Sequence, residues 1–426
     1  DVVQRRDYIF ETVKTAFECY GYTPIETPAM ENIGTLTGKY GDEGDRLIFK
    51  VLNSGDYLVK ADLNNTTNSK SLTKQISEKA LRYDLTVPFA RFVVQNRNDL
   101  IFPFKRYQMQ NVWRADRPQK GRYREFYQCD ADIVGTDSLL CEIELIQLYD
   151  DVFSTLKIPN INICINNRKV LSGMVDLMGA SDLFDSIVVV LDKLDAIGEE
   201  RVKKELLLKG VKEESLLILD VFLNAKDITD ISSLLEKSVI GKKGLNELIF
   251  VTNAIKEQGL QSANLIFDIT LARGLDYYTG CILEVKANDV KIGSIGGGGR
   301  YDDLTSNFGL NNVSGVGISF GIDRIYLVME ELDLFAKDLA KGLDVMFVNF
   351  GVKEASYCLS FLAELRSQGI SSELYPDAEK MKKQMNYANN KRVKYVVLVG
   401  ENEIKTGMLS IKDMDTGEQS NMNIDS

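Results

Sequence analysis

The sequence predicts an α+β protein: an antiparallel sheet flanked by helices, interrupted by a helical insertion and followed by a small α/β domain. Residues 104–114 and 124–134 have the strand-like composition of the two arms of an antiparallel hairpin. Residues 165–250 instead contain several short amphipathic helices, with few aromatic residues and few glycines. Beyond residue 341, strand-like and helix-like segments alternate, which is typical of a small α/β domain.

The first part of the chain divides into segments by its periodicity. Apolar residues at helical spacing predict a first helix that Gly21 ends. A later stretch rich in Asn, Ser, Thr and Lys predicts a mobile loop. In order, we expect a helix over 1–20, an extended segment over 22–30, the mobile loop over 64–79, a helix ending near 97, the hairpin with its turn over 115–123, and a helix over 137–157.

The remaining segments follow from the same patterns. In the insertion we expect helices over 182–196, 199–209, 213–224 and 245–258. After it we expect strand character over 267–284, a flexible glycine-rich loop over 293–299, and a strand running into a helix over 315–332. In the last domain we expect strands over 344–350, 371–375, 395–400 and 409–414, with helices over 353–368 and 378–389.

The chain has 426 residues, of which 51 are basic, 62 are acidic and none is histidine. Without an imidazole, the described sequence excludes a Ser-His-Asp triad, a Cys–His pair, a His-ligated zinc site and a histidine general base. Catalysis must therefore use carboxylates, Arg, Lys, Tyr, backbone amides or groups that the substrate brings.

The apolar runs are short and the cysteines are scattered. The longest runs, 187–191 and 395–399, fall far below the ~18 residues that span a bilayer. The first residues show no signal-peptide core, and the six cysteines form no CxxC motif. We therefore expect a cytoplasmic protein with reduced thiols and no membrane partner.

The net charge of −11 does not exclude a nucleic-acid partner, because binding needs only a local basic surface. Across residues 105–124 there are seven Lys or Arg and a single acid, Asp116. This is the densest basic stretch of an acidic chain.

The predicted hairpin carries the first candidate site. Alternation along its second arm places four side chains on one face: Phe126, Gln128, Asp130 and Asp132. Arg114 ends the first arm, and Arg122 lies on the far side of the loop. Because guanidinium forks match phosphate oxygens, this face suits a zwitterionic ligand next to a phosphate. A solvated strand face with salt bridges is the alternative.

Four other segments carry candidate chemistry, each with a structural alternative. Residues 273–280, RGLDYYTG, offer a cation and two tyrosine hydroxyls for a carboxylate and a polar ring, or form a tight turn. Residues 293–302 let backbone approach a ligand, or form the flexible loop. Arg324 lies in the first turns of a helix, where a cation opposes the helix dipole, which indicates an anionic partner such as a phosphate. Asp84 and Thr86 suit an ammonium group, although Thr86 could instead be a helix N-cap.

Together these segments resemble the class II aminoacyl-tRNA synthetases, and specifically the histidyl-tRNA synthetase family. Residues 20–31 resemble motif 1, 104–135 motif 2 and 315–330 motif 3. RGLDYYTG at 273–280 and GGGRYDDL at 297–304 resemble two signatures peculiar to this family. The resemblance implies a catalytic core over 1–164 and 256–338, a helical insertion over 165–255, and an anticodon-binding α/β domain over 342–426.

The resemblance also implies the reaction and the partners. The activity would be ATP-dependent activation of L-histidine to histidyl-adenylate and transfer to the 3′ end of tRNA(His), with release of pyrophosphate and AMP. Mg²⁺ would arrive with ATP rather than in a dedicated protein cage. The partners would be L-histidine, ATP, tRNA(His) and a second copy in a homodimer, with the 115–123 loop near the acceptor end and the insertion over the acceptor stem.

The family's histidine-binding positions transfer residue by residue. The α-ammonium would lie at Asp84, Leu85 and Thr86. Gln128 would bind the amino-acid backbone, and Asp132 and Tyr278 would hydrogen-bond the imidazole. The complete set implied by the resemblance is Asp84, Leu85, Thr86, Arg114, Gln128, Asp132, Arg273, Tyr277, Tyr278 and Tyr301.

The ATP-binding set is Arg114, Arg122, Phe126 and Arg324. Arg114 would grip the α-phosphate while Phe126 stacks on adenine. Arg122 and Arg324 would hold the distal phosphates. Arg114 and Arg273 would be the catalytic residues, because they spread the charge that develops as the substrate carboxylate attacks the α-phosphorus.

Two alternatives share parts of this pattern. The synthetase-like regulatory subunit of ATP phosphoribosyltransferase typically lacks an anticodon domain and erodes the catalytic arginines, both of which this chain keeps. Threonyl or prolyl synthetases do not fit RGLDYYTG. The chain departs from many family members in having Asp132 where Glu is common and in its YDLT segment. Because it starts inside the first helix, we expect a further short segment before residue 1.

Overall fold

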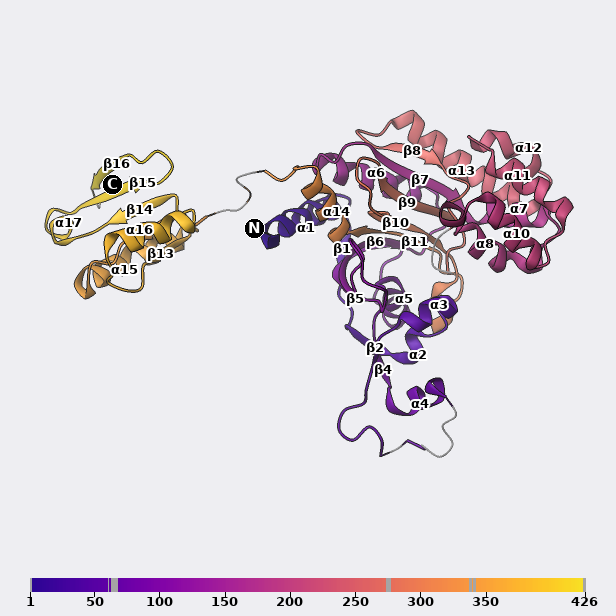
Figure 1. Cartoon of the computed structure of the whole chain (residues 1–426), viewed down its shortest axis with the longest axis horizontal. Coiled ribbons are helices and arrows are strands. Elements are labelled where there is room, and N and C mark those ends of the chain that lie inside the picture. Colours follow the sequence, from indigo (N-terminus) through magenta and orange to yellow (C-terminus); the bar gives the residue numbers. More distant parts are fainter. Residues whose placement is uncertain are drawn as a thin grey trace. The chain divides into compact units, whose positions relative to one another are not determined.

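The computed structural model describes residues 2–59, 61–62, 68–272, 277–336, 339 and 342–423. The chain forms two compact units, Val2–Phe335 and Ala336–Ser426, which are described separately. The first contains a large, mainly antiparallel sheet with helices against it, and the second is a small α/β unit (Figure 1). The predicted fold class is confirmed.

The large sheet has eight strands among the described residues, in the order β1-β5-β6-β11-β10-β9-β7-β8. Neighbouring strands run antiparallel except for the outer pairs β1–β5 and β7–β8. The strands are β1 Thr23–Pro24, β5 Phe104–Trp113, β6 Glu125–Val134, β7 Ile161–Asn167, β8 Asn264–Phe267, β9 Cys281–Ala287, β10 Gly296–Tyr301 and β11 Gly315–Gly321. The predicted hairpin is the antiparallel β5–β6 pair.

One face of this sheet packs against helices. Phe10 of α1 meets Tyr127 of β6 edge to face at 4.9 Å, and Phe17 lies 5.8 Å from Phe320 of β11. The helices of this part are α1 Val2–Cys19, α5 Thr86–Gln95, α6 Leu140–Thr155 and α14 Ile322–Glu331. A short 3₁₀ turn, η4 Leu304–Phe308, lies between β10 and β11.

A small three-stranded sheet, in the order β2-β4-β3, lies near the start of the chain. Its elements are β2 Met30–Asn32, α2 Ile33–Leu36, α3 Gly41–Leu47, β3 Lys50–Val51, α4 Ser69–Ile76 and β4 Lys79–Leu81. The prediction of a loop over 64–79 is wrong for Ser69–Ile76, which is helical because Asn68 caps it by accepting from the backbone N–H of Ser71 at 3.0 Å. Residues 64–67 lie outside the described residues.

The insertion consists of short helices, as predicted. Its elements are α7 Arg168–Leu177, η1 Ser181–Leu183, α8 Phe184–Leu191, α9 Leu194–Ile197, α10 Glu199–Leu208, η2 Glu213–Ser215, α11 Leu216–Leu223, η3 Ile228–Ile231, α12 Ser232–Leu235 and α13 Val239–Gln258. We did not anticipate α7. It packs so closely on α13 that a Cβ on Gly173 would lie 2.4 Å from the Cα of Gly241.

The glycine cluster is a strand and not the expected flexible loop. Gly296–Tyr301 forms β10, which pairs with β9 on one side and β11 on the other. Glycine disfavours strands by propensity, but here the neighbours leave no room for a side chain. A Cβ on Gly298, for example, would lie 2.2 Å from the carbonyl oxygen of Gly317.

The second unit has a five-stranded sheet in the order β13-β12-β14-β15-β16. The alternation predicted for it is confirmed, and α17 and β16 were not anticipated. The elements are β12 Val345–Phe347, α15 Val352–Ser367, β13 Ser372–Leu374, α16 Met381–Asn390, β14 Tyr395–Leu398, α17 Glu401–Thr406, β15 Met408–Asp413 and β16 Gln419–Asn423. In the described part of the chain, no helix is long and apolar enough to cross a membrane.

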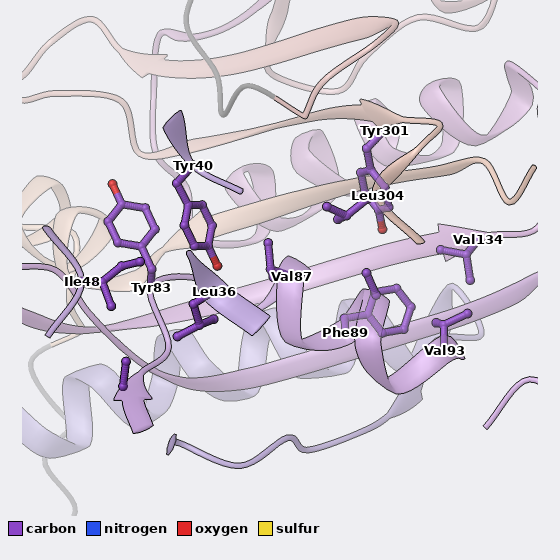
Figure 2. Close-up of a cluster of buried hydrophobic side chains, with 12 residues drawn as sticks. Leu36, Tyr40, Ile48, Tyr83, Val87, Phe89, Val93, Val134, Tyr301 and Leu304 are labelled. Carbon is purple, nitrogen blue, oxygen red and sulfur yellow. The ribbon is translucent and has the colours of Figure 1, made fainter. Parts of the chain in front are cut away.

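A buried cluster joins the small sheet region to the large sheet (Figure 2). The rings of Tyr40 and Tyr83 pack in it at a tilt of 42°, with 4.7 Å between ring centroids, and Tyr301 enters it from β10. Phe89 of α5 is fully buried in the same cluster. These aromatic side chains fix the backbone around Asp84, which lies at the start of α5.

Candidate active site

A cavity of about 450 Å³ opens on the face of the large sheet opposite α1. Its floor is formed by β6, β10 and β11. The sequence-predicted residues that line it are Asp84, Thr86, Arg114, Arg122, Phe126, Gln128, Asp132, Tyr277, Tyr278, Tyr301 and Arg324. Leu85 is fully buried in the core beside it, and Arg273 lies outside the described residues.

The alternation predicted for the second hairpin arm is confirmed. Phe126, Gln128, Asp130 and Asp132 of β6 all line the cavity. Tyr127 also borders it, but its ring packs against Phe10 of α1. Asp130 and Asp132 are each 2% exposed. The alternative of a solvated strand face is therefore wrong for these two carboxylates.

Asp132 is held by protein groups on both of its oxygens. Its Oδ1 accepts from the hydroxyl of Tyr301 at 2.6 Å, and its Oδ2 lies 2.7 Å from Nη2 of Arg106. Arg106 is fully buried and lies over the ring of Phe89 at 4.2 Å. Burial raises the pKa of Asp132, and Arg106 and Tyr301 partly offset that rise.

Asp130, two residues earlier on the same face, has different surroundings. Burial raises its pKa, Arg106 opposes that rise, Asp132 adds to it, and a hydrogen bond with Ser319 lowers it. Ser319 of β11 stands opposite Asp130 in the strand register. The hydroxyl of Ser319 also accepts from Nε2 of Gln128 at 3.0 Å.

Asp84 lies fully buried at the entrance to α5. Its Oδ1 accepts from the hydroxyl of Tyr40 at 2.8 Å and from the backbone N–H of Val87 at 3.1 Å. Its Oδ2 accepts from the hydroxyl of Tyr277 at 3.0 Å. Burial raises the pKa of Asp84, and these hydrogen bonds lower it again. Asp84 therefore caps the first turn, and Thr86 is the first residue of α5 rather than its N-cap.

Arg114 is held between two aromatic rings. Its guanidinium carbon lies 4.3 Å from the ring centre of Tyr83 and 5.2 Å from that of Phe126. Its Nε donates to the carbonyl oxygen of Tyr83 at 3.0 Å. The stack fixes the plane of the guanidinium at the mouth of the cavity.

Two further arginines stand by the hairpin turn. Arg122 is ion-paired with Asp116 at 2.9 Å. Arg324, in the first turn of α14 as predicted, donates from Nε to the carbonyl of Gly121 at 2.8 Å and from Nη1 to that of Ser294 at 2.6 Å. Arg324 thus connects the turn to the segment before β10.

Glycines of the central strands let aromatic and acidic side chains lie close to the sheet. A Cβ on Gly299 would lie 2.9 Å from Cδ1 of Tyr278, and one on Gly317 would lie 2.0 Å from Oδ1 of Asp132. Tyr277 and Tyr278 themselves meet edge to face at 5.0 Å. The glycine-rich strands thus make room for the groups that would read a ligand.

Comparison with known proteins decides the family. The model of histidyl-tRNA synthetases matches residues 61–325, and that of the anticodon binding domain matches residues 344–426. The chain is 57% identical to a histidine–tRNA ligase of Christiangramia forsetii, over 99% of this chain and 94% of that protein. The chain belongs to the histidyl-tRNA synthetase family.

Two further comparisons agree. A histidine–tRNA ligase of Phocaeicola vulgatus is 52% identical over 98% of this chain and 93% of its own length. The crystal structure of histidyl-tRNA synthetase from Nostoc sp. PCC 7120 superposes with a TM-score of 0.77 at 29% identity, covering 99% of this chain and 93% of that one. Members of the histidyl-tRNA synthetase family activate histidine with ATP and transfer it to tRNA(His), and this chain is such a class II ligase.

Sequence reasoning missed several cavity residues. Strand alternation puts Asp130 on the same face as Asp132, which is a usable signal, but the sequence analysis assigns Asp130 no role. Arg106 was counted only as part of the basic stretch. In the structure Lys105 of the same stretch is paired with Glu144 at 2.6 Å, so part of the predicted basic surface is neutralised within the chain. Other cavity residues to which the sequence assigns no individual role include Asp116, Leu283, Glu284, Ser294, Ser319 and Asp323.

Proposed function

We propose that this cavity is where the histidyl-tRNA synthetase reaction takes place, with histidine held at its β6 end. What supports this is the gathering, in one cavity, of three buried carboxylates (Asp84, Asp130 and Asp132) with tyrosine hydroxyls at two of them. A site that hydrogen-bonds a polar ring rejects analogues without those groups by up to ~10⁴–10⁵. Asp84 and Thr86 hold the α-ammonium, Gln128 binds the amino-acid backbone, and Asp132 and Tyr278 face the imidazole.

ATP occupies the arginine side of the same cavity. Arg114 contacts the α-phosphate. The rings of Tyr83 and Phe126 hold its guanidinium in a fixed orientation for this contact. Phe126 stacks on adenine. Arg122 and Arg324 hold the distal phosphates, for which Arg122 exchanges its partner Asp116 for phosphate oxygens.

The chemical step is an in-line displacement. A carboxylate oxygen of histidine attacks the α-phosphorus, the bond from that phosphorus to the β-phosphate oxygen breaks, and pyrophosphate leaves. Arg114 and Arg273 spread the negative charge that develops. The 3′ hydroxyl of tRNA(His) then attacks the acyl carbon of the adenylate and AMP leaves. No step needs a protein imidazole, in agreement with the composition.

Mg²⁺ enters this account with ATP. In the described residues, no cluster of three or more acidic or cysteine side chains could hold a metal ion by itself. Mg²⁺ bound to substrate phosphates needs only one or two protein carboxylates, and Glu284 lines the cavity with a carboxylate. The metal would neutralise charge on the phosphates.

We also propose action as a homodimer in the cytoplasm. Support comes from residues 20–31, which resemble the motif 1 segment of dimeric class II enzymes and leave Met30 52% exposed. The 344–426 unit would contact the anticodon of tRNA(His), in line with its family match. Sedimentation of the purified protein would give a single species of twice the chain mass.

The decisive experiment is ATP–pyrophosphate exchange by the purified protein. Histidine should support exchange, and the other amino acids should not. Arg114→Lys and Arg273→Lys should each lower exchange steeply with the fold intact, because lysine lacks the planar fork. Arg97→Lys, at an exposed position after α5, is the matched control. Exchange that needs a different amino acid, or that survives both active-site changes, would overturn the assignment.

A further inference from the structure

Asp130 is a cavity carboxylate for which the reaction scheme above has no use. Its side chain is 2% exposed, and Asp130 lines the cavity floor between Gln128 and Asp132. Its Oδ1 accepts no hydrogen bond from any residue that the structure describes. A buried acceptor left without a donor destabilises the folded state, so the fold does not gain from this arrangement.

The other two carboxylates of the cavity have protein partners at both oxygens. Both oxygens of Asp84 accept hydrogen bonds, from Tyr40, Val87 and Tyr277. Oδ1 of Asp132 accepts from Tyr301, and its Oδ2, which accepts no hydrogen bond from the described residues, is ion-paired with Arg106. Among the three, Asp130 has the most acceptor capacity left for a ligand.

A second orphaned acceptor lies on the same face. Gln128 donates from Nε2 to Ser319, but its Oε1 also accepts nothing from the described residues. Gln128 and Asp130 are two residues apart on β6, so their side chains project into the cavity side by side. Two neighbouring unpartnered acceptors call for a ligand with N–H donors.

The charges around Asp130 favour a ligand group that brings an additional proton, and so a positive charge, to the cavity. From β5, Arg106 is the main cation near it. Arg82, just before α5, also interacts with Asp130, while its N–H groups donate to Asn111, Thr27 and Gln110. From its own strand and from the start of α5, Asp132 and Asp84 add negative charge. The uncharged titratable groups nearby are the hydroxyl of Tyr278 and that of Tyr149 on α6. The guanidinium of Arg106 is already ion-paired with Asp132, so it must serve both the Asp132 and the Asp130 carboxylates.

We propose that Asp130 is a specificity-determining residue that accepts an imidazole N–H of histidine and shares one additional proton with that ring in the complex. This rests on the proposed placement of histidine in the cavity. The bound pair then consists either of an imidazolium and a carboxylate or of a neutral ring and a carboxylic acid, which hold the same number of protons. The extra proton offsets the excess negative charge, so Asp130 selects a ring that is both a donor and a base.

The number of protons taken up on binding tests this directly. Histidine is titrated into the purified protein calorimetrically between pH 7.5 and 9, in buffers of different ionisation enthalpy. In this range free imidazole, with an ordinary pKa of about 6.5, is mostly neutral. The wild type should take up as much as about one proton more per bound histidine than Asp130→Asn, which keeps the shape and removes the charge. The α-ammonium of histidine contributes equally to both and cancels.

Kinetics supply a second readout. Asp130→Asn should raise the KM for histidine in exchange by about tenfold or more, since a hydrogen bond to a charged group is lost, and leave the KM for ATP within about twofold. Ser319→Ala is the matched control, because it removes a neutral partner of both Gln128 and Asp130 but keeps the Asp130 carboxylate, so proton uptake should persist.

Three outcomes would count against the idea in distinct ways. Equal proton uptake by the wild type and Asp130→Asn overturns the role of Asp130. Histidine binding by the wild type with no proton uptake anywhere in this range overturns it without reference to any variant. A wild type that binds no histidine at all would instead remove the proposed function.

Discussion

A Cβ placed on Gly317 would lie 2.0 Å from Oδ1 of Asp132, so the carboxylate of Asp132 fills the space directly over a glycine of the neighbouring strand. Strand register puts the two residues opposite each other in the β6–β11 pair. Gly317→Ala should therefore displace Asp132 and lower kcat/KM for histidine by about tenfold or more, an overpacking cost of roughly 1–3 kcal/mol. Exchange assays at varied histidine would measure this.

The matched change is Gly34→Ala, at an exposed glycine of α2 with no atom within 4 Å of the added Cβ. It should leave exchange unchanged. If Gly317→Ala keeps its kcat/KM for histidine, then Asp132 can move without loss of activity and does not bind the imidazole ring.

The hydroxyl of Tyr301 supplies the next prediction. It donates to Asp132 at 2.6 Å inside a fully buried pair of side chains. Tyr301→Phe removes that donor, which raises the pKa of Asp132 further and weakens the charge that faces the ring. Hydrogen bonds to charged groups contribute about 1.5–3 kcal/mol, so the KM for histidine should rise roughly 10- to 100-fold. An unchanged KM for histidine would limit Tyr301 to packing.

The sequence predicts the parts of this site that depend on neighbouring residues, and it does not predict those that depend on contacts between distant segments. The face of β6 that carries Phe126, Gln128 and Asp132 follows from alternation, which is a local property. The pairing of Arg106 with Asp132 does not, because it depends on the register between β5 and β6. Composition suggested only that Arg106 belonged to a basic surface, whereas it is fully buried.

The two wrong element predictions have similar causes. Glycine's low strand propensity argued for a loop over 293–299, but Gly298 and Gly299 lie in β10 because adjacent groups occupy the space of a side chain. The polar composition of 64–79 concealed a short capped helix. In each case a tertiary or capping contact overrides the average tendency of the residues.

Arg324 allows a test of ATP binding. Its guanidinium donates to the carbonyls of Gly121 and Ser294 and so positions the hairpin turn beside the cavity. Arg324→Lys should raise the KM for ATP by about tenfold or more, because lysine cannot bond both carbonyls and a phosphate in one plane, with a smaller effect on the KM for histidine. Arg5→Lys is the control, since Arg5 lies away from the cavity, where it pairs with Glu330 of the same helix as Arg324, a half-exposed pair worth about 0–1 kcal/mol, and lies over the ring of Phe335. An equal rise in both KM values would show general disruption instead.

Asp130 should also make the stability of the protein depend on pH. Burial raises its folded-state pKa, so the folded protein holds a proton that the unfolded chain has released. The free energy of unfolding therefore falls as the pH rises above the ordinary aspartate value of about 3.9, until it passes the raised value. An asparagine side chain at this position does not ionise and would carry no such penalty. Asp130→Asn should then raise the thermal unfolding midpoint by about 2 °C or more at pH 8, and the gain should shrink toward pH 4. A variant that is less stable than the wild type at pH 8 would mean that the Asp130 carboxylate stabilises the fold, and that its burial needs no functional explanation.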